Sequence, residues 1–216
     1  MFCSSILLFP TPLFKGCLSC AILLSGVIEM TLDELREKVR NCINCPLSNT
    51  RINAVFGSGN PNADIMFVGE APGKNEDETG EPFVGAAGRM LNDFLTASGI
   101  RREDVFIGNI VKCRPPMNRD PLPAEEERCI GYLMEQIRII DPRIIVCLGR
   151  IAAKQLISPD FQVTKQHGEV FEKNGRLIMA TFHPAALLRN PSYKSATMDD
   201  FDTLYDIAFN RNFRLN

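Results

Sequence analysis

The sequence predicts an α/β protein in which helices cover both faces of a mostly parallel sheet. Three apolar runs have the length of buried strands and lie at 65–68, 105–111 and 143–149. Helical patterns separate these runs, which is typical of βαβ units and of a parallel sheet. The chain has 216 residues and is 45% hydrophobic, which suits one compact domain with a full core.

The first helix is expected over residues 32–40. Thr31 can cap it, and Glu34 lies three residues later, where a capping box requires an acid. Residues 1–29 before this helix are apolar and nearly uncharged. We interpret them as a mis-called start or a disordered extension, with a membrane-associating anchor as the alternative. The folded domain is therefore expected over residues 30–212.

Two more helices are expected between the three apolar runs. Small residues at 85–88 let one helix begin close to other backbone, and Gly99 lies where a glycine ends such a helix. Pro123 and the acids after it begin another helix, which runs to about Ile140.

The last third of the chain continues the alternation. A helix is expected from Gly149 through Ile157, and a final helix over 199–209. Between them, 163–171 and 177–182 are predicted strands, joined by a turn of the Asn-Gly type.

Loops rich in polar residues follow three of the predicted strands. They carry residues 70–83, 109–114 and 183–189. Because the carboxyl ends of parallel strands share one edge of a sheet, these loops should meet, and such edges are where α/β sheets bind ligands.

Four of the eight cysteines have a spacing that favours a metal centre. Cys42 and Cys45 form a CxxC pair, and Cys113 and Cys129 could complete four ligands. Four thiolates suit structural zinc or an iron–sulfur cluster, and the spacing does not choose between them. Buried apolar thiols are the alternative. A chain of this size needs no disulfide staples, so a reducing, cytoplasmic compartment is expected.

The side chains of the three loops could recognise a planar, polar ligand. The Asn109 amide offers a donor beside an acceptor, as a base edge does, and Phe83 could stack on a ring. His183 could donate to a developing anion, while Glu70 or Glu76 could orient a water molecule. Ordinary turn, core and surface roles are the alternatives for each.

Four motifs together resemble those of the family 4 uracil-DNA glycosylases. They are GEAPGKNED at 69–77, EPFVG at 81–85, GNIVKCRPP at 108–116 and HPAALLRNP at 183–191. The resemblance covers roughly Leu32 to Phe209. It implies a three-layer α/β/α sandwich with a four-stranded parallel sheet, and a 4Fe-4S cluster on the four cysteines. It also implies hydrolysis of deoxyuridine in DNA, which releases uracil and leaves an abasic site for base excision repair.

The resemblance assigns a role to each pocket residue. Phe83 would stack on the flipped uracil, Asn109 would read its N3–H and O4, and His183 would bond O2 as the base leaves. The backbone at Glu70 and Ala71 would contact the base. A carboxylate would handle the attacking water, with Glu76 the first choice and Glu70 the second.

Single- and double-stranded uracil-containing DNA is the expected partner. The net charge of −2 argues against binding to nucleic acid by overall charge, so a local basic patch is needed. Leu187 and Leu188 are predicted to wedge into the vacated base stack. The predicted phosphate contacts are Lys112, Arg114, Arg119 and Arg189. Replication or repair proteins are candidate further partners, and a monomer without membrane contact is expected.

Two rival functions stay open at this point. One is a family 5 type of glycosylase with a broader base range, against which Glu70 and Gly73 argue, because that family carries GLAPA where this chain has GEAPG. The other is a non-catalytic iron–sulfur DNA-binding module.

Overall fold

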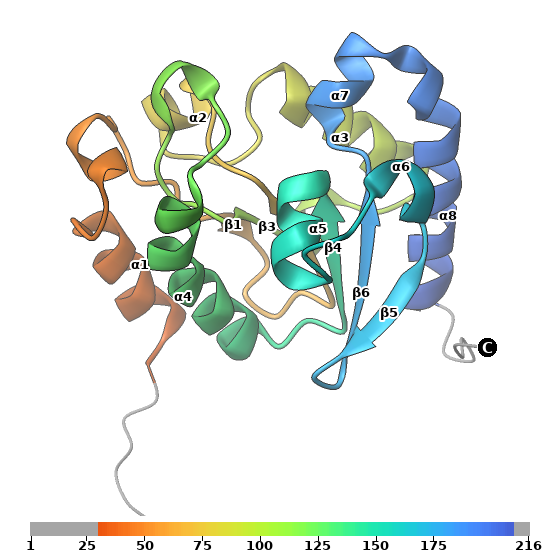
Figure 1. The fold of residues 1–216 in the computed structure, drawn as a ribbon. Helices are drawn as coiled ribbons and strands as arrows, with labels where there is room; N and C mark the ends of the chain where they lie inside the picture. Colours follow the sequence, from red (N-terminus) through yellow and green to blue (C-terminus); the bar gives the residue numbers. More distant parts are fainter. Residues whose placement is uncertain (1–29, 210–216) are drawn as a thin grey trace, which may run out of the picture.

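The computed structural model describes residues 30–209, and within them the strands form one six-stranded sheet (Figure 1). The strand order is β1-β3-β2-β4-β6-β5. The four central strands run parallel: β2 (Ile65–Gly69), β3 (Phe106–Asn109), β4 (Ile144–Leu148) and β6 (Arg176–Thr181). The predicted mostly parallel α/β sheet is therefore confirmed.

Two antiparallel edge strands extend the four expected strands to six. β1 (Ser58–Gly59) pairs with β3, and β5 (Val170–Lys173) pairs with β6 through the predicted Asn-Gly turn. A two-residue strand is too short to show an alternation of apolar and polar residues, so β1 was not predicted.

Helices cover both faces of this sheet, as the side-chain alternation of β2 shows. Met66 and Val68 pack in one core cluster with α1 (Leu32–Arg40), α4 (Pro123–Ile140) and α5 (Arg150–Leu156). Ile65 and Phe67 pack in the other with α3 (Ala86–Ala97) and α8 (Lys194–Phe209). The result is the three-layer α/β/α arrangement, with the helices on either side of the strands in Figure 1.

The helix ends follow the signals in the sequence. The Thr31 hydroxyl accepts from the Glu34 amide while the Glu34 carboxylate accepts from the Thr31 amide, so the predicted capping box is present. α4 begins at Pro123 and ends at Ile140 as expected. α8 begins five residues before the predicted helix, directly after a single turn at Pro191–Tyr193.

Three short helices were not expected. They are α2 (Lys74–Thr79), α6 (Val163–Gln166) and α7 (Pro184–Arg189). The predicted strand over 163–171 was wrong, because its first four residues close a helical turn onto Gln162 and only 170–173 form a strand. α7 replaces part of the loop expected at 183–189. Single turns also lie at Pro46–Asn49, Arg102–Asp104 and Pro116–Asn118.

The interpretation of residues 1–29 lies outside the described residues. Over 30–209, no helix is both long and apolar enough to cross a membrane.

Candidate active site

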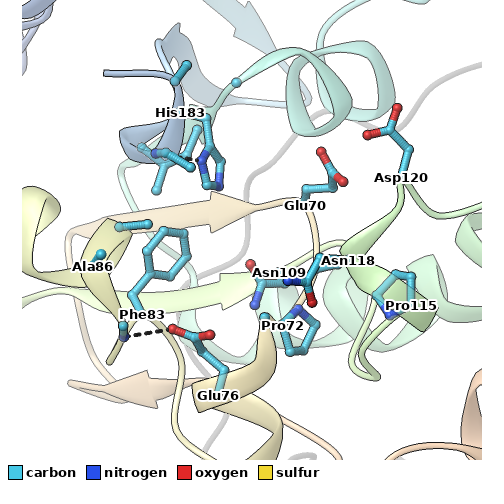
Figure 2. Close-up of a pocket in the computed structure, with 18 of the residues that line it drawn as sticks. Glu70, Pro72, Glu76, Phe83, Ala86, Asn109, Pro115, Asn118, Asp120 and His183 are labelled. Carbon is cyan, nitrogen blue, oxygen red and sulfur yellow. Dashed lines mark hydrogen bonds between the residues drawn. The ribbon is translucent and has the colours of Figure 1, made fainter. Parts of the chain in front are cut away.

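The tips of three parallel strands meet at one cavity of about 610 Å³. Glu70 follows β2, Asn109 ends β3 and His183 follows β6, and all three side chains line it (Figure 2). Phe83 and Ala71 line it too. The expectation that these loops share one edge of the sheet is confirmed.

Phe83 forms one wall of the cavity and is held in a strained backbone conformation. Its φ is +54°, which side-chain-bearing residues rarely adopt. Its ring centroid lies 5.7 Å from that of His183, at an interplanar angle of 35°. Beneath it, a Cβ on Gly88 would lie 1.8 Å from the Phe83 carbonyl oxygen, so only glycine permits this approach. The strain therefore fixes the face that Phe83 presents to a ligand.

Asn109 offers a buried acceptor that the protein itself leaves free. The residue is 1% exposed, and its Oδ1 has no hydrogen-bond partner among the described residues. Asn109 pairs in register with Gly69 of β2, where a Cβ would lie only 2.4 Å from that oxygen. A buried amide oxygen without a partner is costly, so a ligand that donates to it gains affinity.

His183 is a neutral donor aimed at the cavity. Its Nδ1 accepts a hydrogen bond of 3.1 Å from the Ala185 amide, as the cap of α7. Burial, with the positive charge of Arg189 second, lowers the pKa of His183 to about 4. The imidazole is thus uncharged at neutral pH, and since Nδ1 accepts, its proton lies on Nε2. Figure 2 shows the ring directed toward Glu70 and Asn109.

Glu70 is a carboxyl group poised to titrate near neutral pH. Burial, with the negative charge of Asp120 second, raises the pKa of Glu70 to about 7, while Arg150 acts in the opposite direction. Figure 2 shows the two carboxyl groups of Glu70 and Asp120 side by side on one rim. Such a group can accept a proton from water at physiological pH.

Sequence reasoning missed Asp120 and Arg150. Both line the cavity, and a guanidinium nitrogen of Arg150 contacts the Asp120 carboxylate. Asp120 lies in an irregular loop and Arg150 begins α5, so no periodic pattern distinguishes them. The Gly149 that precedes Arg150 at the end of β4 was the available signal, because the tip of every parallel strand belongs to this edge.

Glu76 holds the chain that follows Phe83. Its Oε1 accepts from the amides of Val84 and Gly85 at 3.0 and 2.9 Å. These bonds join α2 to the start of α3 and leave the second carboxylate oxygen near Gly73 at the cavity wall. Glu76 therefore positions the aromatic wall, whatever else it does.

Two residues that were predicted to contact DNA from the surface are buried in the structure. Lys112 is 1% exposed and its ammonium lies between β3 and α4, bonded to the Asn109 carbonyl and to Gln136. Leu187 is 0% exposed and packs in the core beneath α7. The sequence pattern treated both as loop residues, whereas the chain turns each side chain inward.

The other predicted contacts lie on the surface around the cavity. Leu188 is 47% exposed, beside the buried Leu187, and Arg189 lines the cavity. Arg114 is bonded to Asn118, and Arg119 forms a two-point ion pair with Glu125. An ion pair reduces the charge that Arg119 offers to a phosphate, so Arg189 and Arg114 are the better candidates.

The four cysteines approach one another from different elements. Cys42 follows α1, Cys45 precedes the turn at 46–49, Cys113 follows β3 and Cys129 lies on α4. All are free thiols, as is Cys147, which lies in the core of β4. The thiols of Cys42 and Cys45 act electrostatically on Cys113, and those of Cys113 and Cys45 act on Cys129. The four sulfurs therefore share one region.

These sulfurs also receive hydrogen bonds that suit thiolates. Backbone amides of Asn44 and Lys112 donate to Cys42 and Cys129, and the Arg51 guanidinium donates to Cys113 at 3.1 Å. In residues 30–209, no group of three or more cysteine, histidine or acidic side chains is arranged to hold a metal ion. The chemistry of four thiol donors suits both an iron–sulfur cluster and structural zinc.

Comparison with known proteins shows the family to which the chain is similar. The family model described as "Uracil DNA glycosylase superfamily" matches residues 56–205. The chain is 44% identical over 186 residues to the Type-4 uracil-DNA glycosylase of Archaeoglobus fulgidus, covering 82% of this chain and 94% of that protein. It is 47% identical over 166 residues to that of Thermotoga maritima, covering 76% and 86%. A Type-5 uracil-DNA glycosylase of Pyrobaculum aerophilum is 33% identical over 146 residues, covering 60% and 64%.

Proposed function

The chain belongs to the uracil DNA glycosylase superfamily and excises uracil from DNA, and we propose how its pocket does so. The enzyme hydrolyses the N-glycosidic bond of deoxyuridine, which releases uracil and leaves an abasic site. One observation carries the assignment of residues: an aromatic ring, a free amide oxygen and a neutral imidazole line the same cavity. The greater identity to Type-4 than to Type-5 relatives favours the narrower, uracil-directed activity.

Recognition of the base rests on Asn109 and Phe83. The free Oδ1 of Asn109 accepts from N3–H of a flipped uracil while its NH₂ group donates to O4. Cytosine reverses this donor and acceptor order and would leave buried polar groups unpaired, so one fixed amide rejects it. Phe83 stacks on the ring, which is worth about 1–3 kcal/mol per base.

Release of the base rests on His183. The leaving uracil carries negative charge, and the Nε2–H of His183 donates to O2. Because the imidazole is neutral and held by the Ala185 amide, this donor needs no reorganisation when the charge develops. A pre-placed donor of this kind lowers the barrier by about 2.7–4 kcal/mol.

Glu70 accepts a proton from the attacking water, and Glu76 has a supporting role at the opposite wall of the cavity. The sugar develops oxocarbenium character as the bond breaks, so a nearby carboxylate stabilises it. Glu76 was the first choice from the sequence. Its commitment to two backbone amides, together with the pKa of about 7 at Glu70, favours Glu70 as the proton acceptor.

DNA is held at the rim of the cavity. The half-exposed Leu188 enters the space that the flipped base vacates, and Arg189 and Arg114 contact the flanking phosphates. These few cations provide the local patch that a chain of net charge −2 requires. The expectations of a monomer and of replication or repair partners stay predictions.

The cysteines hold a 4Fe-4S cluster with a structural role. Cys42, Cys45, Cys113 and Cys129 would ligate it, and it would tie α1 to the chain after β3 and to α4. Because Cys113 lies four residues after Asn109, this tie steadies the loop next to the base-reading amide. Iron analysis of the purified protein tests the cluster, and zinc without iron would contradict it.

Excision of uracil from labelled oligonucleotides tests the activity. Single-stranded and duplex substrates are incubated with the protein, and alkali then cleaves any abasic site. We expect breaks at uracil and none at cytosine in the same position. Binding of uracil-containing DNA without cleavage, in protein that carries its iron, would instead favour the non-catalytic iron–sulfur module.

A further inference from the structure

Lys112 is a buried cation that the protein's carboxylates do not neutralise. Its Nζ donates to the Asn109 carbonyl at 2.9 Å and to Gln136 Oε1 at 2.6 Å, and both partners are uncharged. In the part of the chain that the structure describes, no carboxylate lies within ion-pair distance of this ammonium. Burial of an unpaired charge costs several kcal/mol, on the order of the stability of a domain. An anionic partner close to the ammonium would offset this cost.

The candidates for that counter-charge are the sulfurs of Cys129 and Cys113, which adjoin the Lys112 backbone. The backbone amide of Lys112 donates to Cys129 Sγ at 3.3 Å, and Lys112 directly precedes Cys113 in the chain. Both sulfurs act electrostatically on the Lys112 ammonium. If both sulfurs are thiolates within a cluster, the ammonium has its anionic partners.

We propose that Lys112 is a positioning residue which neutralises the thiolates of Cys113 and Cys129 and at the same time fixes the backbone of Asn109. This inference rests on the proposed cluster and on the proposed role of Asn109 in reading uracil. The buried charge of Lys112 then links the cysteine site to the base-reading amide. Loss of the cluster from the cysteines should therefore change the geometry of Asn109.

The orientation of the surrounding groups supports this arrangement. The Gln136 NH₂ group donates to the Phe56 carbonyl at 2.9 Å, which turns its oxygen toward Lys112. The ammonium is thus clamped between α4 and the tip of β3, and the Asn109 carbonyl cannot rotate without losing a charged donor. Because the Asn109 side chain has a free Oδ1, its direction depends on its backbone.

The test compares Lys112→Met with Arg51→Gln in the iron-loaded protein. Methionine keeps the length and apolar stem of lysine without its charge. Arg51 donates to Cys113 Sγ and to the Arg40 carbonyl and does not line the cavity, so its variant perturbs the cysteine site without removing a group from the base-reading pocket. Two quantities are measured: the rate at which a chelator bleaches the iron–sulfur absorbance, and kcat/KM for uracil excision per loaded enzyme.

We expect Lys112→Met to bleach about 10-fold faster and to lose about 10-fold or more in kcat/KM, as is usual for groups that support metal ligands. Arg51→Gln should bleach faster with kcat/KM within about twofold of the wild type. The proposal is overturned if the absorbance of Lys112→Met bleaches at the wild-type rate, or if kcat/KM of that variant is unchanged. Equal losses of kcat/KM in both variants also overturn it, because activity would then follow the cluster without Lys112.

Gln136→Glu carries the test if Lys112→Met does not fold. A carboxylate beside the ammonium competes with the thiolates, so bleaching should accelerate by about threefold or more while the Asn109 carbonyl keeps its donor. Unchanged bleaching would overturn the proposal. A wild-type protein that bleaches normally but does not cleave at uracil would contradict the proposed function and not the role of Lys112 at the cysteines.

Discussion

Replacing Glu70 with glutamine should stabilise the fold, and by more at pH 8 than at pH 5. Burial and then Asp120 raise the pKa of Glu70 from 4.5 to about 7. A carboxyl group with a higher pKa in the folded state than in the unfolded chain destabilises the fold only when it must ionise. The penalty is absent below pH 4.5, grows as the pH rises, and is complete above about pH 7. Glutamine cannot ionise, so the variant escapes it.

The size of the effect follows from the pKa. At about 1.36 kcal/mol per tenfold change in proton affinity, a rise from 4.5 to about 7 gives an upper limit of roughly 3.4 kcal/mol. Glu70 is only partly buried, so solvent screening reduces this to about 1–2 kcal/mol. Since about 1 kcal/mol shifts Tm by roughly 2–4 °C in a chain of this size, we expect a gain of about 2–8 °C at pH 8.

Thermal unfolding followed by circular dichroism at pH 5 and pH 8, at equal ionic strength, measures this gain. Glu127→Gln is the matched control, because Glu127 is an exposed carboxylate on α4 outside the cavity. The gain of Glu70→Gln over wild type should be larger at pH 8. An equal gain at both pH values, or a variant less stable than wild type at pH 8, would refute the reasoning.

Four further changes test the site by excision kinetics. Asp120→Asn removes the like charge beside the carboxyl base, so the acid limb of the kcat/KM profile should move to lower pH; an unmoved limb would contradict the electrostatic link. Asn109→Asp loses the donor for O4, and kcat/KM for uracil should fall by about 100-fold or more; activity within threefold of wild type, about 0.7 kcal/mol, would sink the assignment. His183→Ala should lower kcat by about 10²–10³, and a smaller loss would argue against an oxyanion donor. Leu188→Ala should slow excision from duplex more than from single-stranded DNA, and equal slowing would argue against a wedge.

The sequence located the edge of the sheet where the site lies, for a physical reason. Strands buried on both faces appear in the sequence as continuous apolar runs. In a parallel sheet the carboxyl ends of these strands lie at the same edge. Phe83, Asn109 and His183 could therefore be placed at one cavity without coordinates. Short helices such as α7 escaped detection, because six residues are too few for a helical period and a proline follows the cap.

The direction of a side chain on an irregular segment was not predictable. Lys112 and Leu187 both lie beside polar residues, and the pattern placed them at the surface, yet each is buried. The Lys112 side chain turns inward because the Asn109 carbonyl and the Gln136 side-chain oxygen accept its hydrogen bonds there. These contacts depend on the tertiary structure, so the local sequence does not indicate them. The pairing of Asp120 with Glu70 and Arg150 likewise joins three segments that are distant in the chain.

The reading residues are fixed by close packing against backbone more than by hydrogen bonds. A Cβ at Gly69 would lie 2.4 Å from Asn109 Oδ1 and 2.7 Å from the Phe83 ring, and one at Gly149 would lie 2.8 Å from His183 Cβ. Bare backbone at these two strand ends therefore sets where the side chains stand, and Asn109 Oδ1 is left without a hydrogen-bond partner. A hydrogen bond from the protein to Asn109 Oδ1 would have competed with the base for this acceptor. The protein thus keeps a strained Phe83 and an unsatisfied amide at some cost to its stability, and under the proposed mode of recognition a bound uracil would supply the missing contacts.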